Sequence, residues 1–288
     1  MNKQGFQWMD IAQVLLSERG VDGRIPYHPY KKWYGGHWVL SQLADIEYPK
    51  GEASLLPLRE QVYEWLFSDR HQDSIQVING LTRICASLEG NAVYYLIKLG
   101  LEDERTELLV NKLIEYQWPD GGWNCDRNPS AKNSSFMESL IPMRGLTIYG
   151  KTKKHDGALK AAKKASEIFL KRQLFLGERN GKVIKPDFVL LHYPCYWHYD
   201  ILFGLKVMAE ADFIDDPRCK KAIELLQSKR LPNGDFPSEG KYYKVISADK
   251  ENRTSGSSLV NWGPVSKKTG NPWATRDANF VFNFLKKG

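Results

Sequence analysis

Apolar residues recur at three- and four-residue spacing along most of this 288-residue chain, in segments that short Gly-, Pro- and Asp-containing turns separate. This spacing predicts α-helices rather than strands. One set of segments is apolar on almost every side, which is typical of buried helices, and it comprises residues 37–47, 88–99, 136–149, 196–209 and 273–285. A second set is amphipathic and carries much of the charge: residues 58–67, 105–116, 158–173 and 217–229. We therefore predict an all-α protein.

The two kinds of helix alternate along the chain, which indicates an array of about five helix hairpins. Such an array forms either an open superhelix or a closed ring. Buried helices inside a ring of amphipathic ones suit the two compositions, so we predict an (α/α) toroid. The N-terminal helix, residues 6–19, lacks an inner partner and the last buried helix lacks an outer one, so we expect these two to pair. Residues 1–288 then form one domain, with the long polar stretch 231–272 as a flap over one end.

Composition and charge narrow the classes of partner. Hydrophobic residues make up 42% and aromatic residues 12% of the chain, which indicates a folded protein with an aromatic interior or cleft. Lys and Arg exceed Asp and Glu by 41 − 34 = 7, a bias that permits a small anionic ligand but does not indicate nucleic acid. No stretch approaches the roughly 20 apolar residues of a membrane span, and the first residues lack a signal-peptide pattern. The four cysteines lie far apart and fit reduced thiols, so we expect a cytoplasmic location.

The segment YQWPDGGWNCD, residues 116–126, ends one amphipathic helix with two glycines and a tryptophan. It resembles the Gln-x-x-Asp-Gly-Gly-Trp repeat of the terpenoid cyclase and protein prenyltransferase superfamily, known from squalene cyclases. The segment QSKRLPNGDF, residues 227–236, is similar to a degraded copy of it. In the motif itself, glycines permit a tight turn after a helix. We expect Gln117, Asp120 and Trp123 to staple the hairpin rather than to catalyse a reaction.

Longer stretches resemble uncharacterised bacterial proteins built on the same barrel. They include KWYGGHWVLSQLADI, residues 32–46, and HYPCYWHYDILFGL, residues 192–205. This resemblance implies an (α/α) toroid fold and no established reaction. Our first functional hypothesis is that an aromatic-lined central cavity in this toroid accepts an apolar or isoprenoid-like ligand. The Asp-x-Asp-Asp acid of the proton-initiated cyclases is absent, and no stretch matches the zinc ligands of the prenyltransferases. Squalene cyclisation and ordinary protein prenylation are therefore not expected.

Inner helices of a hairpin ring all begin at the same end, so residues near their starts should converge on the mouth of the cavity. Acid–base chemistry there needs carboxyl and imidazole groups whose pKa values burial moves towards neutrality. The candidate catalytic residues are His37, Glu138, His198 and Asp200. The candidate substrate-binding residues are Trp33, Trp38, Arg144, Tyr193, Trp197, Trp273, Arg276 and Asp277.

Several of these residues have a structural alternative. Asp200 and Asp277 lie in first turns of helices, where carboxylates cap the helix or complement its dipole. Arg144 interrupts an apolar helix. It is therefore either half of an internal ion pair, with Glu138 or a carboxylate of a neighbouring helix, or a clamp for a phosphate or carboxylate ligand.

Imidazole and thiolate ligands suit zinc or iron, and the candidate ligands are Cys125, His192 and Cys195. No chain-local pair has the spacing of a known zinc motif. We therefore expect no cofactor, with zinc as the exception to test.

Three classes of function stay open. The first is an enzyme that holds an apolar or isoprenoid-like ligand among aromatic rings, whose faces stabilise cations. The second is a carbohydrate-active lyase or hydrolase that uses paired carboxylates, here Glu138, Asp200 and Asp277. The third is a non-enzymatic module that binds a small ligand or a peptide. The fold does not choose among them, and the sequence predicts no oligomeric state.

Overall fold

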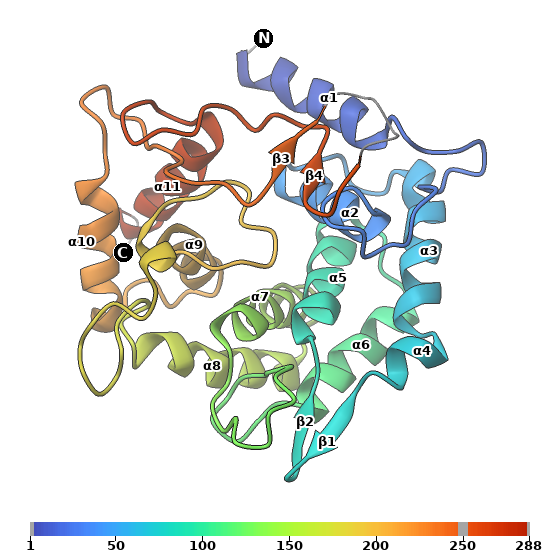
Figure 1. Cartoon of the computed structure of the whole chain (residues 1–288), viewed down its shortest axis with the longest axis horizontal. Helices are drawn as coiled ribbons and strands as arrows, with labels where there is room; N and C mark the ends of the chain where they lie inside the picture. Colours follow the sequence, from blue (N-terminus) through green and yellow to red (C-terminus); the bar gives the residue numbers. More distant parts are fainter. Residues whose placement is uncertain (1–2, 247–252, 287–288) are drawn as a thin grey trace.

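Helices make up nearly all of the secondary structure in the computed structural model, which describes residues 3–246 and 253–286 (Figure 1). The five predicted buried helices are all present: α2 (Gly36–Asp45), α5 (Ala86–Leu99), α7 (Phe136–Lys153), α9 (Ile201–Glu210) and α11 (Pro272–Leu285). So are the amphipathic ones: α3 (Leu56–Leu66), α6 (Glu104–Glu115), α8 (Asp156–Leu170) and α10 (Lys220–Ser228). Helix α1 (Lys3–Leu16), the one-turn α4 (Asp69–Gln72) and the 3-10 turns Ala53–Leu55, Pro186–Val189 and Pro217–Cys219 complete the set. The all-α prediction is confirmed, apart from four short strands within the described ranges.

The buried helices pack on one another in chain order: α2 on α5, α5 on α7, α7 on α9, and α9 on α11. The first four are also covered by an amphipathic neighbour, in the pairs α2–α3, α5–α6, α7–α8 and α9–α10. Figure 1 shows α3, α6, α8 and α10 at the periphery, with α2, α5, α7 and α9 inside them. The buried side chains of both sets belong to one hydrophobic core. In the described residues, no helix has the length and apolarity that crossing a membrane requires.

The closest helix contact, between α5 and α7, depends on glycine. A Cβ atom at Gly90 would lie 2.5 Å from the Cα of Pro142, and one at Gly145 would lie 2.3 Å from the carbonyl oxygen of Gly90. Both distances are shorter than atoms tolerate, so only glycine lets the two backbones approach this far. The crossing brings the starts of α5 and α7 together, and this positions the reactive groups described below.

The expected pairing of α1 with α11 is wrong. Helix α1 packs against α2, with Ile11, Ala12 and Leu15 buried. The outer side of α11 is covered instead by the chain that follows α10, where Phe236 stacks on Phe282 at a ring distance of 5.7 Å. An aromatic contact supplied by a loop therefore takes the place of the missing outer helix.

The sequence pattern also missed a β-hairpin. Strands β1 (Gln76–Ile78) and β2 (Leu81–Arg83) are antiparallel, with Val77 opposite Thr82. They are joined by Asn79 and Gly80, whose φ angles of 51° and 73° are those of a two-residue hairpin turn. Three-residue strands are too short to show an alternating pattern. The Asn-Gly pair, which is typical of hairpin turns, was the feature of the sequence that indicated this hairpin.

The stretch 231–272 lies over the starts of α9 and α11. Tyr242 stacks on His198 at 3.6 Å between ring centroids, and Trp262 packs against Trp273. Asn271 caps α11 by accepting hydrogen bonds from the backbone of Trp273 and Ala274. The stretch also contains the parallel pair β3 (Lys244–Val245) and β4 (Ser257–Ser258). Residues 247–252 of the expected flap lie outside the described residues.

Candidate functional site

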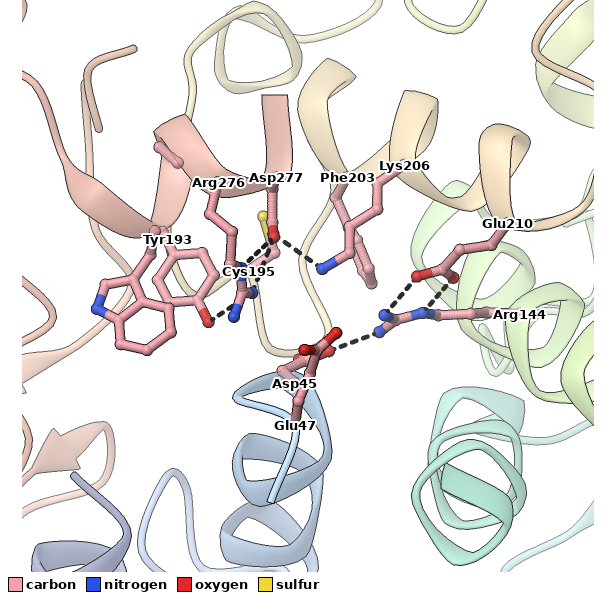
Figure 2. Close-up of polar contacts among 12 residues, drawn as sticks. Asp45, Glu47, Arg144, Tyr193, Cys195, Phe203, Lys206, Glu210, Arg276 and Asp277 are labelled. Atoms are coloured by element: carbon pink, nitrogen blue, oxygen red, sulfur yellow. Dashed lines mark hydrogen bonds and ion pairs between the residues drawn. The ribbon is translucent and has the colours of Figure 1, made fainter. Parts of the chain in front are cut away.

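A network of ion pairs joins the buried helices at one end of the fold (Figure 2). Arg144 of α7 donates to both carboxylate oxygens of Glu210, at 2.7 and 2.8 Å. It also donates to Asp45 at 3.0 Å and to the hydroxyl of Tyr94 at 2.7 Å, and its guanidinium lies 3.6 Å from the centre of the Tyr94 ring. Every nitrogen of the Arg144 guanidinium thus has an acceptor. The ion-pair reading of Arg144 fits this geometry, with carboxylates of the neighbouring helices α2 and α9 as partners rather than the other expected partner, Glu138.

A second group of ion pairs, beside the first, joins α9 to one further helix, α11. Lys206 of α9 donates to Asp277 of α11 at 2.9 Å, and Arg276 donates to the other oxygen of that carboxylate at 2.8 Å. Burial opposes ionisation of Asp277, but the charges of Lys206 and Arg276 prevail and lower the pKa of its carboxyl. Asp277 is therefore an internal counter-ion rather than the helix cap that its position suggested.

A cavity of about 270 Å³ adjoins this network, and we call it the central cavity. All five buried helices line it, with Asp45, Glu47, Tyr94, Lys98, Arg144, Lys151, Lys206, Glu210, Arg276, Asp277 and Phe280 among its walls. The structure thus brings three predicted binding residues together here, namely Arg144, Arg276 and Asp277. Because the cationic and anionic side chains are already paired with one another, the main role of these ion pairs is to hold the helices together.

A second and larger space lies at the opposite, N-terminal ends of α5 and α7. We call this space of about 550 Å³ the thiol cleft. Its walls are largely aromatic and apolar and include His28, Tyr30, Trp65, His71, Leu88 and Trp197, with Arg70 also present. Cys85, Cys125 and Glu138 lie together in its wall, with the two sulfurs and a carboxylate oxygen all within 4.8 Å of one another. Three sequence candidates, Cys125, Glu138 and Trp197, are therefore neighbours.

Backbone hydrogen bonds explain why these three groups meet. The N–H of Ile84 donates to the carbonyl of Asn124, so the chain leaving β2 runs beside the chain after the Gly-Gly-Trp turn. This pairing places Cys85, at the start of α5, next to Cys125. Glu138, in the first turn of α7, accepts a 2.9 Å hydrogen bond from the free N–H of Ser87 in the first turn of α5.

The electrostatics of the cluster follow from its burial. Burial, and then the neighbouring Cys125, raise the pKa of Glu138 to about 8. The hydrogen bond between the two thiols lowers the pKa of Cys125 to about 6 and raises the pKa of Cys85. At neutral pH the metal-free cluster therefore combines a thiolate at Cys125 with a protonated carboxyl at Glu138, which are a nucleophile and an acid.

His37 is not part of either cavity, so its predicted catalytic role is not supported by its position. Its side chain is completely buried, with Nδ1 3.1 Å from the hydroxyl of Tyr95 and Nε2 3.4 Å from the amide nitrogen of Asn91. Burial lowers the pKa of the imidazole to about 3. His37 is thus a neutral core residue that links α2 to α5.

Asp200 and His198 have structural contacts as well. Asp200 caps α9 by accepting from the N–H of Phe203 at 2.8 Å, and its other oxygen accepts from the backbone of His192 at 2.6 Å. This cap starts α9 at Ile201, five residues later than predicted. His198 lies between the rings of Trp197 and Tyr242, and burial lowers its pKa to about 4.

The predicted zinc candidates do not assemble as one group. His192 and Cys195 contact Asp200, at 3.2 and 3.4 Å, beneath the 231–272 stretch. Cys125 lies instead in the thiol cleft with Cys85, a residue that the sequence reading missed. The sequence feature that could have identified Cys85 is its position just before the predicted buried helix 88–99.

Most of the predicted aromatic binding residues pack in the core. Trp33 stacks on Tyr196 at 3.8 Å, and Trp38 lies edge-on to Trp33. Tyr193 stacks on Trp273 at 5.6 Å, and Arg276 lies 4.8 Å above the Trp273 ring. None of these four predicted rings lines the central cavity or the thiol cleft.

No family model, curated protein or solved structure matches this chain. The chemistry of the two cavities is therefore what points to a function.

Proposed function

We propose that this chain is an (α/α) toroid enzyme that binds an apolar or isoprenoid-like ligand in the thiol cleft. The proposal of a toroid is supported by the packing order of α2, α5, α7, α9 and α11, and by the fact that all five helices line one cavity. The amphipathic helices at the periphery in Figure 1 correspond to an outer ring. In this arrangement, the thiol cleft lies at the mouth formed by the helix starts.

One observation carries the choice of the thiol cleft: it is the place where aromatic walls and reactive groups coincide. Tyr30, Trp65 and Trp197 supply apolar faces that suit a hydrocarbon ligand and stabilise positive charge. Cys125 and Glu138 supply a nucleophile and an acid in the same wall. In the central cavity, by contrast, the charged side chains are already paired with one another or with their neighbours.

The carbohydrate-active alternative has less support in this geometry. Its expected acids are Glu138, Asp200 and Asp277. Glu138 lies in the thiol cleft, Asp200 is completely buried as a helix cap, and Asp277 is paired with two cations. Paired catalytic carboxylates need to face one shared space, and these three do not line either cavity together.

Farnesol is the probe that tests the proposal. We expect it to bind the reduced, full-length protein and to change the tryptophan fluorescence, because Trp65 and Trp197 line the cleft. Trp197→Ala should weaken binding by about tenfold or more, since a large apolar contact worth roughly 1.5–3 kcal/mol is lost. The matched control is Phe280→Ala, which removes an aromatic ring from the central cavity instead.

The two variants separate the possible outcomes. Loss of affinity in Phe280→Ala, with Trp197→Ala unchanged, would assign the ligand to the central cavity and contradict the proposal. Binding of maltohexaose without binding of farnesol would support the carbohydrate-active alternative. Binding of farnesol without any turnover of isoprenoid substrates would leave a binding module in place of an enzyme.

A further inference from the structure

We propose that Cys85, Cys125 and Glu138 form a site for a thiophilic divalent cation, zinc by its chemistry, with one coordination position open to the thiol cleft. Their three donor atoms come from separate segments of the chain and lie within 4.8 Å of one another. Two thiolates and a carboxylate are a ligand set that zinc accepts in proteins. This set differs from the predicted one, since it contains neither His192 nor Cys195.

The spacing of the donors is close to that of a tetrahedral site. Zinc binds thiolate at about 2.3 Å and carboxylate oxygen at about 2.0–2.2 Å, which places neighbouring donors roughly 3.5–3.8 Å apart. The sulfur of Cys125 is already 3.8 Å from Oε1 of Glu138. A contraction of about 1 Å at most would therefore bring all three donors onto one ion.

The supporting structure holds the three donors from outside. Ser87 N–H binds Oε2 of Glu138, so Oε1 is the oxygen left to face Cys125. The backbone of Trp123 accepts from the N–H of Ser135 at 2.9 Å and donates to the hydroxyl of Ser139 at 3.1 Å, which fixes the chain just before Cys125. Ligands positioned in this way by hydrogen bonds are typical of built metal sites.

The charge balance also points to a cation. The neighbouring buried carboxylate, Glu89, has both His71 and Lys112 as ion-pair partners. Glu138 has no Lys, Arg or His partner within residues 3–246 and 253–286, although its side chain is 8% exposed. Asp277 likewise has Lys206 and Arg276, so Glu138 lacks the cationic partner that these two other buried acids have, and a bound cation would supply it when the carboxyl is ionised.

Three protein ligands and one open position are the arrangement of catalytic rather than structural zinc. The open side faces the cleft, because Cys85 is solvent-exposed there. A role for the ion in a reaction rests on the function proposed above, but binding of the ion does not. An ion would turn Cys125 and Glu138 from nucleophile and acid into ligands, and its open position would become the reactive one.

Cobalt(II) is the probe for the test. The reduced, full-length protein is stripped with a chelator and titrated with Co²⁺, then with Zn²⁺. We expect a thiolate-to-cobalt charge-transfer band that one equivalent of Zn²⁺ abolishes. Cys85→Ser, Cys125→Ser and Glu138→Gln should each weaken zinc binding by at least about 100-fold, more than the loss of an outer-shell partner. Cys219→Ala is the matched control, because Cys219 is a buried thiol that donates to the carbonyl of Phe213.

Circular dichroism of each variant separates lost ligands from lost folding, and Cys85→Ser is the variant best suited to this, because Cys85 is exposed. The proposal is overturned if no charge-transfer band forms, or if the band persists in the Cys85→Ser/Cys125→Ser double variant. Formation of a Cys85–Cys125 disulfide on mild oxidation, in a protein that binds no Co²⁺, would identify a redox pair instead. Farnesol binding is measured on the metal-free protein, so either proposal can fail alone.

Discussion

Replacing Arg144 with alanine is expected to lower the free energy of unfolding by about 3–5 kcal/mol, measured by urea denaturation. The side chain of Arg144 is only 4% exposed and is the shared partner of Glu210 and Asp45. Its removal leaves two carboxylates and the hydroxyl of Tyr94 without their donor, and it removes a guanidinium that stacks on the Tyr94 ring. Asp45 and Glu210 are only 23% and 22% exposed, and leaving such largely covered carboxylates unpaired costs more than the pair itself contributes.

The matched control for Arg144 is Arg24→Ala. Arg24 also makes a two-pronged ion pair, with Glu64, but the two side chains are 37% and 57% exposed. Exposed pairs contribute about 0–1 kcal/mol, so this variant should stay close to the wild type. If both variants lost the same small amount of stability, the network in Figure 2 would not tie the helices together.

Replacing Trp123 with alanine is expected to cost about 3–5 kcal/mol of unfolding free energy, because the side chain is completely buried. Its indole N–H donates to the carbonyl of Leu113 at the end of α6. Its backbone holds the start of α7 through Ser135 and Ser139. Trp123 therefore connects α6 to α7 and fixes the chain that carries Cys125, so the variant should also lose affinity for Co²⁺.

The control for Trp123 is Trp197→Ala, in which the same residue type is removed from the half-buried wall of the thiol cleft. That variant should lose much less stability while it loses farnesol affinity. Equal free energies of unfolding in the two variants would show that Trp123 of the Gly-Gly-Trp turn does not hold α6 and α7 together.

The sequence pattern was sufficient to predict the nine central helices. An amphipathic helix shows apolar residues at three- and four-residue spacing, and a fully buried helix shows apolar residues on almost every side. Both patterns are visible within a single segment. The remaining features depend on contacts between segments. Nothing local shows that Phe236 covers α11 in place of α1, because that contact joins a loop to a helix more than 40 residues later. The β1–β2 hairpin was not predicted for a different reason: its strands have only three residues each, too few to show an alternating pattern.

The candidate site was predicted in part. The starts of α5 and α7 lie together and leave a cleft with reactive groups, whereas the 231–272 stretch covers the starts of α9 and α11. Cys85 could not be paired with Cys125 from sequence, because the pairing depends on the hydrogen bond between Ile84 and Asn124. The partners of Arg144 were equally hidden, because Asp45 and Glu210 are the last residues of their helices, where exposed charges are ordinary.

Ligand protection of the thiols tests the central claim most directly. The reduced, full-length protein is alkylated with iodoacetamide with and without saturating farnesol, and each cysteine is followed by mass spectrometry. We predict that farnesol slows alkylation of Cys85 and Cys125 by about tenfold or more, since a ligand in the cleft covers both sulfurs. The buried Cys195 and Cys219 should react slowly in either case. Equal rates at Cys85 and Cys125 with and without bound farnesol would contradict the account, because the ligand would then occupy some other part of the molecule.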